Sequence, residues 1–132
     1  MKNEQLAARR QLWEAFVKDH QPDATAAHHL QRMLFAYTRY PEAESALNHL
    51  PRTGDHVLDF GCGVGDYGVS FACRGWKVTF CDVPEVLEFV RFRCRHEAIN
   101  AEFIESPSEF EGFDAVVFGE VLEHLTNPLK LL

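Results

Sequence analysis

The chain has 132 residues, with 13 Lys plus Arg, 20 Asp plus Glu and a formal net charge of -7 at pH 7. This length suits one compact domain and excludes two independent active-site domains. The acidic balance disfavours a nucleic-acid partner, because counterion release requires a broad basic surface. No apolar run is long enough to span a bilayer, so no membrane partner is expected.

Residues 1–51 are predicted to form a helical segment that acts as a cap or lid. Pro22 separates two stretches in which apolar residues recur at helical spacing, and Pro41 opens a short third helix. These positions are expected to pack in a core; they are Leu6, Trp13, Phe16, Val17, Leu30, Met33, Leu34 and Tyr37. The N-terminus has no apolar core of a signal peptide, which favours a cytoplasmic protein.

Residues 52–132 are predicted to form the second part, in which short apolar strands alternate with helices. Gly75 is expected to end the first of these helices in the left-handed conformation. The predicted strands are 56–60, 76–81, 101–105 and 113–118, and the predicted helices are 66–74 and 84–98. This order predicts an α/β fold, a Rossmann-like parallel sheet of about four strands flanked by helices, with right-handed crossovers.

The most informative segment is 57–65, where a strand leads into Gly61, Gly63 and Gly65 and then into a helix. Glycine permits positive φ and close approach to a ligand. The N–H groups of such a turn and of a helix start can bind a carboxylate or a phosphate. Asp82 follows the next strand, where a doubly wound fold presents an acid to ribose hydroxyls. The pattern predicts a site for an adenosine-containing cofactor at the carboxyl ends of the strands.

The position after Gly65 bears on which cofactor is bound. The dinucleotide fingerprint requires a glycine there, and this chain has Asp66. A carboxylate at the start of the helix is also expected to repel a pyrophosphate. NAD or FAD, and with it an NAD-dependent oxidoreductase, is therefore the less favoured alternative.

Three motifs in order resemble those of class I S-adenosylmethionine-dependent methyltransferases. Segment 57–65 resembles the family's first motif, Asp82 fits its acidic residue after the second strand, and segment 112–125 resembles its fourth-strand motif. The resemblance covers about residues 50–132. It implies S-adenosylmethionine as cofactor and in-line methyl transfer to a small-molecule acceptor. The cofactor-binding residues that it implies are Asp59, Gly61, Cys62, Gly63, Gly65, Asp82, Val83, Ser106 and Gly119.

Adenine recognition departs from the pattern of many family members. Pro107 stands near the position of an acid that binds the adenine amino group, and proline has no side-chain acceptor. The resemblance then implies that adenine is bound by backbone groups or by Glu105, Ser106 or Ser108.

Glu120 and His124 are the candidate catalytic residues. They are four positions apart and would share one face of a helix after the fourth strand, where His124 could serve as a general base. A helix-start turn in which His124 caps or packs is the alternative. No metal site is predicted, because the histidines lack a Cys or carboxylate at ligand spacing. The four cysteines form no CxxC pair, and we expect reduced, mostly buried thiols.

Family domains have seven strands, whereas the segment after Phe118 is long enough for one helix only. Strand 115–118 would then be an apolar edge, which favours association. We expect that the chain is a fragment, or that a homodimer or a partner chain covers strand four. The alternative function is a non-catalytic module that binds S-adenosylmethionine or S-adenosylhomocysteine, such as half of a split enzyme.

Overall fold

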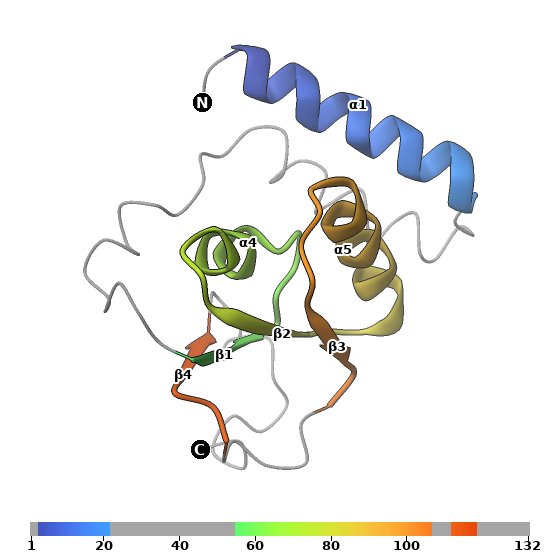
Figure 1. The fold of residues 1–132 in the computed structure, drawn as a ribbon. Coiled ribbons are helices and arrows are strands. Elements are labelled where there is room, and N and C mark those ends of the chain that lie inside the picture. Colours follow the sequence, from blue (N-terminus) through green and yellow to red (C-terminus); the bar gives the residue numbers. More distant parts are fainter. Residues whose placement is uncertain (1–2, 22–54, 107–111, 119–132) are drawn as a thin grey trace.

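The computed structural model of the chain describes residues 3–21, 55–106 and 112–118 (Figure 1). These residues contain a four-stranded sheet of order β3-β2-β1-β4, in which every neighbouring pair is parallel. The strands are β1 (His56–Phe60), β2 (Lys77–Cys81), β3 (Glu102–Ile104) and β4 (Ala115–Phe118). The helices are α1 (Asn3–His20), α4 (Asp66–Cys73) and α5 (Pro84–His96). The predicted Rossmann-like α/β fold is confirmed.

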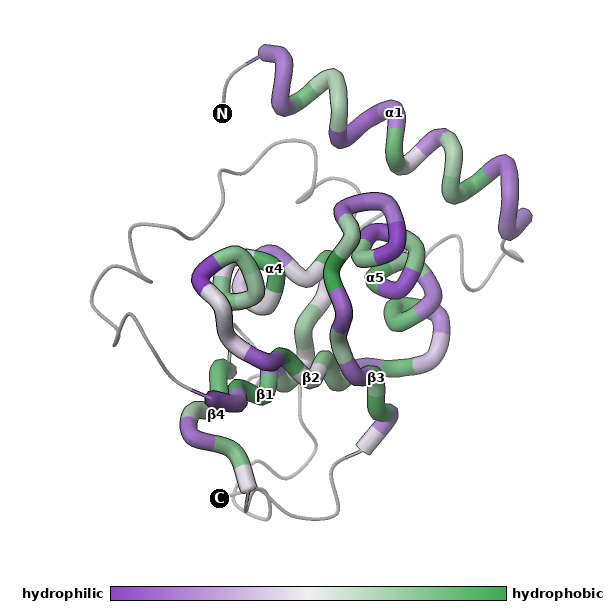
Figure 2. The backbone as a smooth tube through the Cα atoms, viewed as in Figure 1, coloured by the Kyte–Doolittle hydropathy of each residue, from purple (hydrophilic) through white to green (hydrophobic). Residues whose placement is uncertain are grey.

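Helices α4 and α5 are the crossovers between the first three strands, and both lie on the same side of the sheet (Figure 1). In Figure 2 hydrophobic residues dominate the sheet, whereas α1 alternates between polar and apolar positions. Strands β1 and β2 are buried at their central positions, and each has a parallel neighbour on both sides. Because β1 and β2 pair in parallel, with Phe60 opposite Cys81, their carboxyl ends meet at one edge of the sheet.

Both crossover helices end with a residue in the left-handed region. Gly75 has a φ of 91°, as predicted, and the Trp76 N–H donates to the Phe71 carbonyl at 3.1 Å. Ala98 has a φ of 55° and the Ile99 N–H donates to the Cys94 carbonyl at 2.8 Å. The prediction that α5 continues to about Ala98 is therefore too long, because this closing turn begins after His96.

Helix α1 packs into the same hydrophobic core as the sheet. The Trp13 and Phe16 rings lie 5.5 Å and 5.3 Å, between centroids, from the Phe89 ring of α5. The buried residues of α1 are Arg9, Leu12, Trp13 and Phe16, which recur at helical spacing. The predicted amphipathic helix is confirmed, and its buried stripe faces α5. The prediction that Val17 packs in the core is wrong, because Val17 is 36% exposed.

Several predicted features lie outside the described residues: the helices after Pro22, and the residues Pro107, Gly119, Glu120 and His124. Within the described ranges β4 pairs with β1.

No helix in those ranges is both long and apolar enough to cross a bilayer. All four cysteines are free; three are buried and Cys73 is exposed.

Candidate active site

The loop after β1 is tied to the end of β2. The N–H groups of Gly61 and Cys62 both donate to the carbonyl of Cys81, at 2.9 Å and 3.0 Å. Three positive φ angles, 66° at Gly61, 56° at Gly63 and 87° at Gly65, bend the chain into α4. The alternate glycines of the sequence thus have a conformational reason, since side chains disfavour such angles.

Asp82 lies directly against this loop. Its Oδ2 accepts a hydrogen bond from the Gly63 N–H at 2.9 Å, and its Oδ1 accepts one from the Val83 N–H at 2.7 Å. A carboxylate has about four acceptor positions, so Asp82 retains capacity for ligand hydroxyls. The structure thus brings together the glycine loop and the acid of the next strand.

The surroundings of Gly63 fit a ligand that approaches the backbone closely. A Cβ atom built on Gly63 would meet no other atom within 4 Å, so this side of the loop faces open space. Val83 is 44% exposed and follows Asp82 directly, where an apolar side chain is available to an aromatic base. These features fit a nucleoside whose sugar is near Asp82.

Asp59 is buried, unlike Asp82. Its Oδ2 accepts a hydrogen bond from the Gly68 N–H at 3.0 Å. Burial raises the pKa of Asp59, the Gly68 hydrogen bond lowers it, and the negative charges of Asp82 and Asp66 raise it, so that the pKa lies at about 7. Asp59 therefore has a structural role: it accepts a hydrogen bond from the first turn of α4.

Most N–H groups of the glycine loop are not available to a ligand, because they donate within the protein. The N–H groups of Gly61, Cys62 and Gly63 donate within the protein, and that of Gly65 donates to the Cys62 carbonyl at 2.9 Å. By helix geometry the N–H groups of Asp66 and Tyr67, in the first turn of α4, have no intrahelical acceptor. A ligand carboxylate would therefore be received at the start of α4 or at the Val64 N–H rather than at the other N–H groups of the loop.

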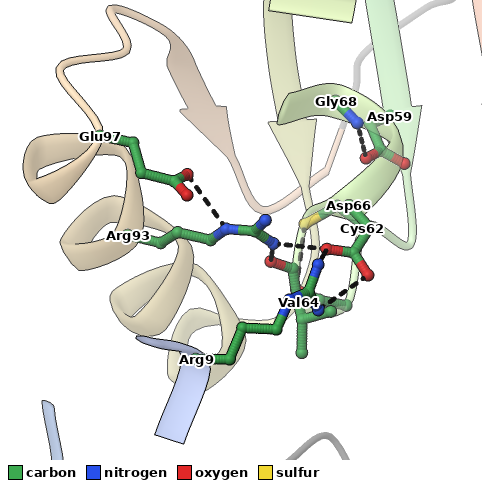
Figure 3. A network of polar contacts seen from close by, with 9 residues as sticks. Arg9, Asp59, Cys62, Val64, Asp66, Gly68, Arg93 and Glu97 are labelled. Carbon is green, nitrogen blue, oxygen red and sulfur yellow. Dashed lines mark hydrogen bonds and ion pairs between the residues drawn. The ribbon is translucent and has the colours of Figure 1, made fainter. Parts of the chain in front are cut away.

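Asp66, the first residue of α4, is paired with two arginine side chains (Figure 3). Its Oδ1 lies 2.9 Å from Nη2 of Arg9 and 2.7 Å from Nη1 of Arg93. Two guanidinium groups thus contact this carboxylate, which weakens the repulsion argument against a pyrophosphate. The glycine spacing remains the argument against a dinucleotide.

Sequence reasoning missed both arginines. Arg93 and Arg9 are 1% and 5% exposed. Each occupies the apolar stripe of its helix, three residues from Val90 and from Leu12 respectively. A charged residue on an otherwise buried helix face is the signal that could have identified them, because buried charges require partners.

Gly68 was also missed as a functional position. A Cβ atom at Gly68 would lie 2.7 Å from Cζ of Phe80 and 3.0 Å from Cγ1 of Val78, closer than side chains pack. The absence of a side chain lets α4 approach β2. In a dinucleotide fingerprint the third glycine has this packing role, and here Gly68 performs it two residues later than the fingerprint position.

The remaining predicted site residues differ in accessibility. Cys62 is buried, and burial, followed by the charges of Asp59 and Asp82, raises its thiol pKa well above the usual value. Burial likewise raises the pKa of Cys81 to about 11. Neither thiol is activated as a nucleophile. Ser106 is exposed after β3.

Comparisons with known proteins identify methyltransferases as relatives of this chain. Ubiquinone biosynthesis O-methyltransferase from Pseudoalteromonas translucida is 34% identical over 83 residues, 58% of this chain and 35% of that protein. The enzyme of the same name from Vibrio cholerae is 34% identical over 86 residues, 60% of this chain and 35% of that protein. The chain thus spans about a third of the length of these relatives.

Two solved structures share the fold. The PH0226 protein from Pyrococcus horikoshii OT3 superposes with a TM-score of 0.56 at 26% identity, over 67% of this chain and 43% of that chain. A structure described as "Conversion of a Disulfide Bond into a Thioacetal Group during Echinomycin Biosynthesis" gives a TM-score of 0.53 at 26% identity, over 63% of this chain and 37% of that one. A family model described as a methyltransferase domain matches residues 19–132. The chain therefore belongs to the methyltransferase domain family, in its class I S-adenosylmethionine-dependent group.

Proposed function

We propose that this chain is the cofactor-binding part of an S-adenosylmethionine-dependent methyltransferase that methylates a small molecule. The observation that carries the proposal is the contact between Asp82 and Gly63, with 2.9 Å between Oδ2 and the backbone nitrogen. It makes the end of β2 and the loop after β1 into a single site. That site combines an acid for a sugar, an open glycine backbone and a helix start for a carboxylate.

Each residue has a role in this proposal that follows from its position. Asp82 accepts the ribose hydroxyls, because two of its acceptor positions are used and the others are available. Val83 packs against adenine. Asp59 provides an acceptor behind the loop for the ammonium group of the methionine moiety. Ser106 contributes to the adenine side of the site.

The reaction requires mainly alignment. When bound, S-adenosylmethionine supplies a methyl group on a positively charged sulfur. The chain's own residues orient the donor: Asp82 fixes the sugar, and the first turn of α4 fixes the carboxylate. Holding the acceptor in line accounts for most of the catalysis in such a transfer, since proximity and exclusion of water replace covalent chemistry.

Proton removal from the acceptor is proposed for His124, with Glu120 beside it. Both follow β4 in the sequence, and Gly119 precedes them as a backbone contact to the cofactor. The acceptor is proposed to be a small molecule with an oxygen nucleophile. The support is the O-methyltransferase activity in the names of the relatives.

Calorimetric titration with S-adenosylhomocysteine tests the proposal. The unaltered chain is expected to bind it, and Asp82→Asn is expected to weaken binding by at least about tenfold, because hydrogen bonds to charged groups contribute about 1.5–3 kcal/mol. Glu85→Gln is the matched control, since Glu85 is exposed and only three residues away. Binding of NAD, or no binding of S-adenosylhomocysteine, would refute the proposal.

A further inference from the structure

The carboxylate of Asp66 joins three helices at the end of the cofactor loop (Figure 3). Asp66 is the first residue of α4, Arg9 comes from α1 and Arg93 from α5. We infer that docking of α1 and binding of the cofactor are coupled through this carboxylate. The inference rests on the proposed function and goes beyond it, because it makes α1 part of the cofactor site.

Arg93 connects the loop to the helix start. Its Nη1 donates to the carbonyl of Val64 at 2.8 Å and to Oδ1 of Asp66 at 2.7 Å. Its Nε donates to Oε2 of Glu97 at 3.2 Å. One buried nitrogen therefore holds the middle of the glycine loop and the first residue of α4 together. A change at Asp66 is transmitted to the loop through this shared donor.

Arg9 connects α1 to the same carboxylate. Its Nη2 lies 2.9 Å from Oδ1 of Asp66 and its Nη1 lies 3.3 Å from Oδ2, so both oxygens are engaged by one guanidinium. Such paired contacts are geometrically specific. The apolar side chains of α1 pack against α5, as Trp13 does against Phe89. Arg9 thus extends the docking of α1 from α5 to the cofactor loop.

The charge balance supplies the physical link. Two buried guanidinium groups, those of Arg9 and Arg93, face two carboxylates, those of Asp66 and Glu97. If α1 leaves, Asp66 loses one of its two cations and the negative charge at the start of α4 increases. That charge opposes a ligand carboxylate at the same helix start. Docked α1 therefore favours cofactor binding.

Linkage makes the effect reciprocal: whatever factor α1 docking adds to cofactor affinity, cofactor binding adds to α1 docking. The family match begins at residue 19, so Arg9 lies outside it. The coupling is therefore inferred for this chain from its own contacts.

Hydrogen exchange of the α1 amides, with and without saturating S-adenosylhomocysteine, tests the inference. In the unaltered chain the ligand is expected to slow exchange in residues 3–20. In Arg9→Met the dissociation constant is expected to rise by about fivefold or more, the lower end of usual couplings, and α1 exchange no longer responds to saturating ligand. Arg10→Met is the matched control, because Arg10 is exposed on the same helix, and it is expected to behave like the unaltered chain.

Arg9→Lys keeps the positive charge of the side chain but not its paired contacts with Asp66. It replaces Arg9→Met in the test if circular dichroism shows that Arg9→Met is unfolded. Weaker ligand binding and a smaller response of α1 exchange in Arg9→Lys than in Arg10→Met support coupling. Ligand binding without any change in α1 exchange, or equal affinity of Arg9→Met and Arg10→Met, would overturn the inference and leave the proposed function standing. Failure of the unaltered chain to bind the ligand would instead overturn the proposed function.

Discussion

The carboxylate of Asp59 accepts a hydrogen bond from the backbone N–H of Gly68, 3.0 Å away, and so connects β1 to the first turn of α4. Gly68 is the third residue of that helix, where an N–H has no intrahelical acceptor. The N-cap residue, Gly65, has no side chain to serve this function. Asp59 therefore acts as a cap from the neighbouring strand.

Asp59→Asn is expected to stabilise the chain at alkaline pH. The folded-state pKa is raised from 3.8 to about 7, so the folded state binds more protons than the unfolded state between these values. Stability consequently falls as pH rises through this window. Asparagine keeps an acceptor for the Gly68 N–H without the buried charge. The free energy of unfolding of the variant relative to the unaltered chain should increase by about 2–3 kcal/mol between pH 5 and pH 8.

Urea unfolding at the two pH values measures this difference. Asp55→Asn is the control, because Asp55 is exposed immediately before β1, and its difference from the unaltered chain should be the same at both pH values. A pH-independent effect of Asp59→Asn would contradict the assignment of a buried, protonatable carboxyl group.

Gly68→Ala is expected to destabilise the chain even though alanine favours helices. The added Cβ atom would lie 2.7 Å from Cζ of Phe80, a fully buried ring. Overpacking of this kind costs about 1–3 kcal/mol, more than the propensity gain of up to about 1 kcal/mol. Equilibrium unfolding should show the loss, and Phe80→Leu combined with Gly68→Ala should recover part of it. Additive effects of the two substitutions would contradict direct contact.

The local elements could be predicted from the sequence because their signals are local. Alternation of apolar runs with helical stretches identifies β1, α4, β2 and α5, and Gly75 marks the end of α4. The meeting of Asp82 with the glycine loop follows from parallel topology alone, since carboxyl ends of neighbouring strands share an edge.

The long-range contacts could not be predicted. Arg9 and Asp66 are 57 positions apart, and no periodicity in either segment specifies that they meet. The same applies to Gly68, whose fit against Phe80 depends on how closely α4 approaches β2. Helix α5 ends early because of the turn in which Ala98 has a positive φ. Glycine usually marks such a position in a sequence, and alanine does not. These contacts depend on how the elements pack in three dimensions, and the pattern of residues in a single sequence does not specify that packing.

Arg93→Lys is expected to destabilise the chain although it preserves the charge. A lysine has one ammonium group, which cannot reproduce contacts made by both Nε and Nη1 of the guanidinium. The Val64 carbonyl or one of the two carboxylates then loses its buried donor. Loss of such a partner costs about 1–3 kcal/mol.

Arg95→Lys is the matched control for this substitution, because Arg95 is exposed on the same helix and surface substitutions usually change stability by less than about 0.5 kcal/mol. Urea unfolding of the two variants should therefore separate them clearly. Because Arg93 holds the Val64 carbonyl in the glycine loop, Arg93→Lys should also weaken S-adenosylhomocysteine binding, whereas Arg95→Lys should not. Equal stability of the two variants would mean that the buried guanidinium contacts are replaceable, and that the glycines, Asp82 and the Cys81 carbonyl are enough to hold the loop.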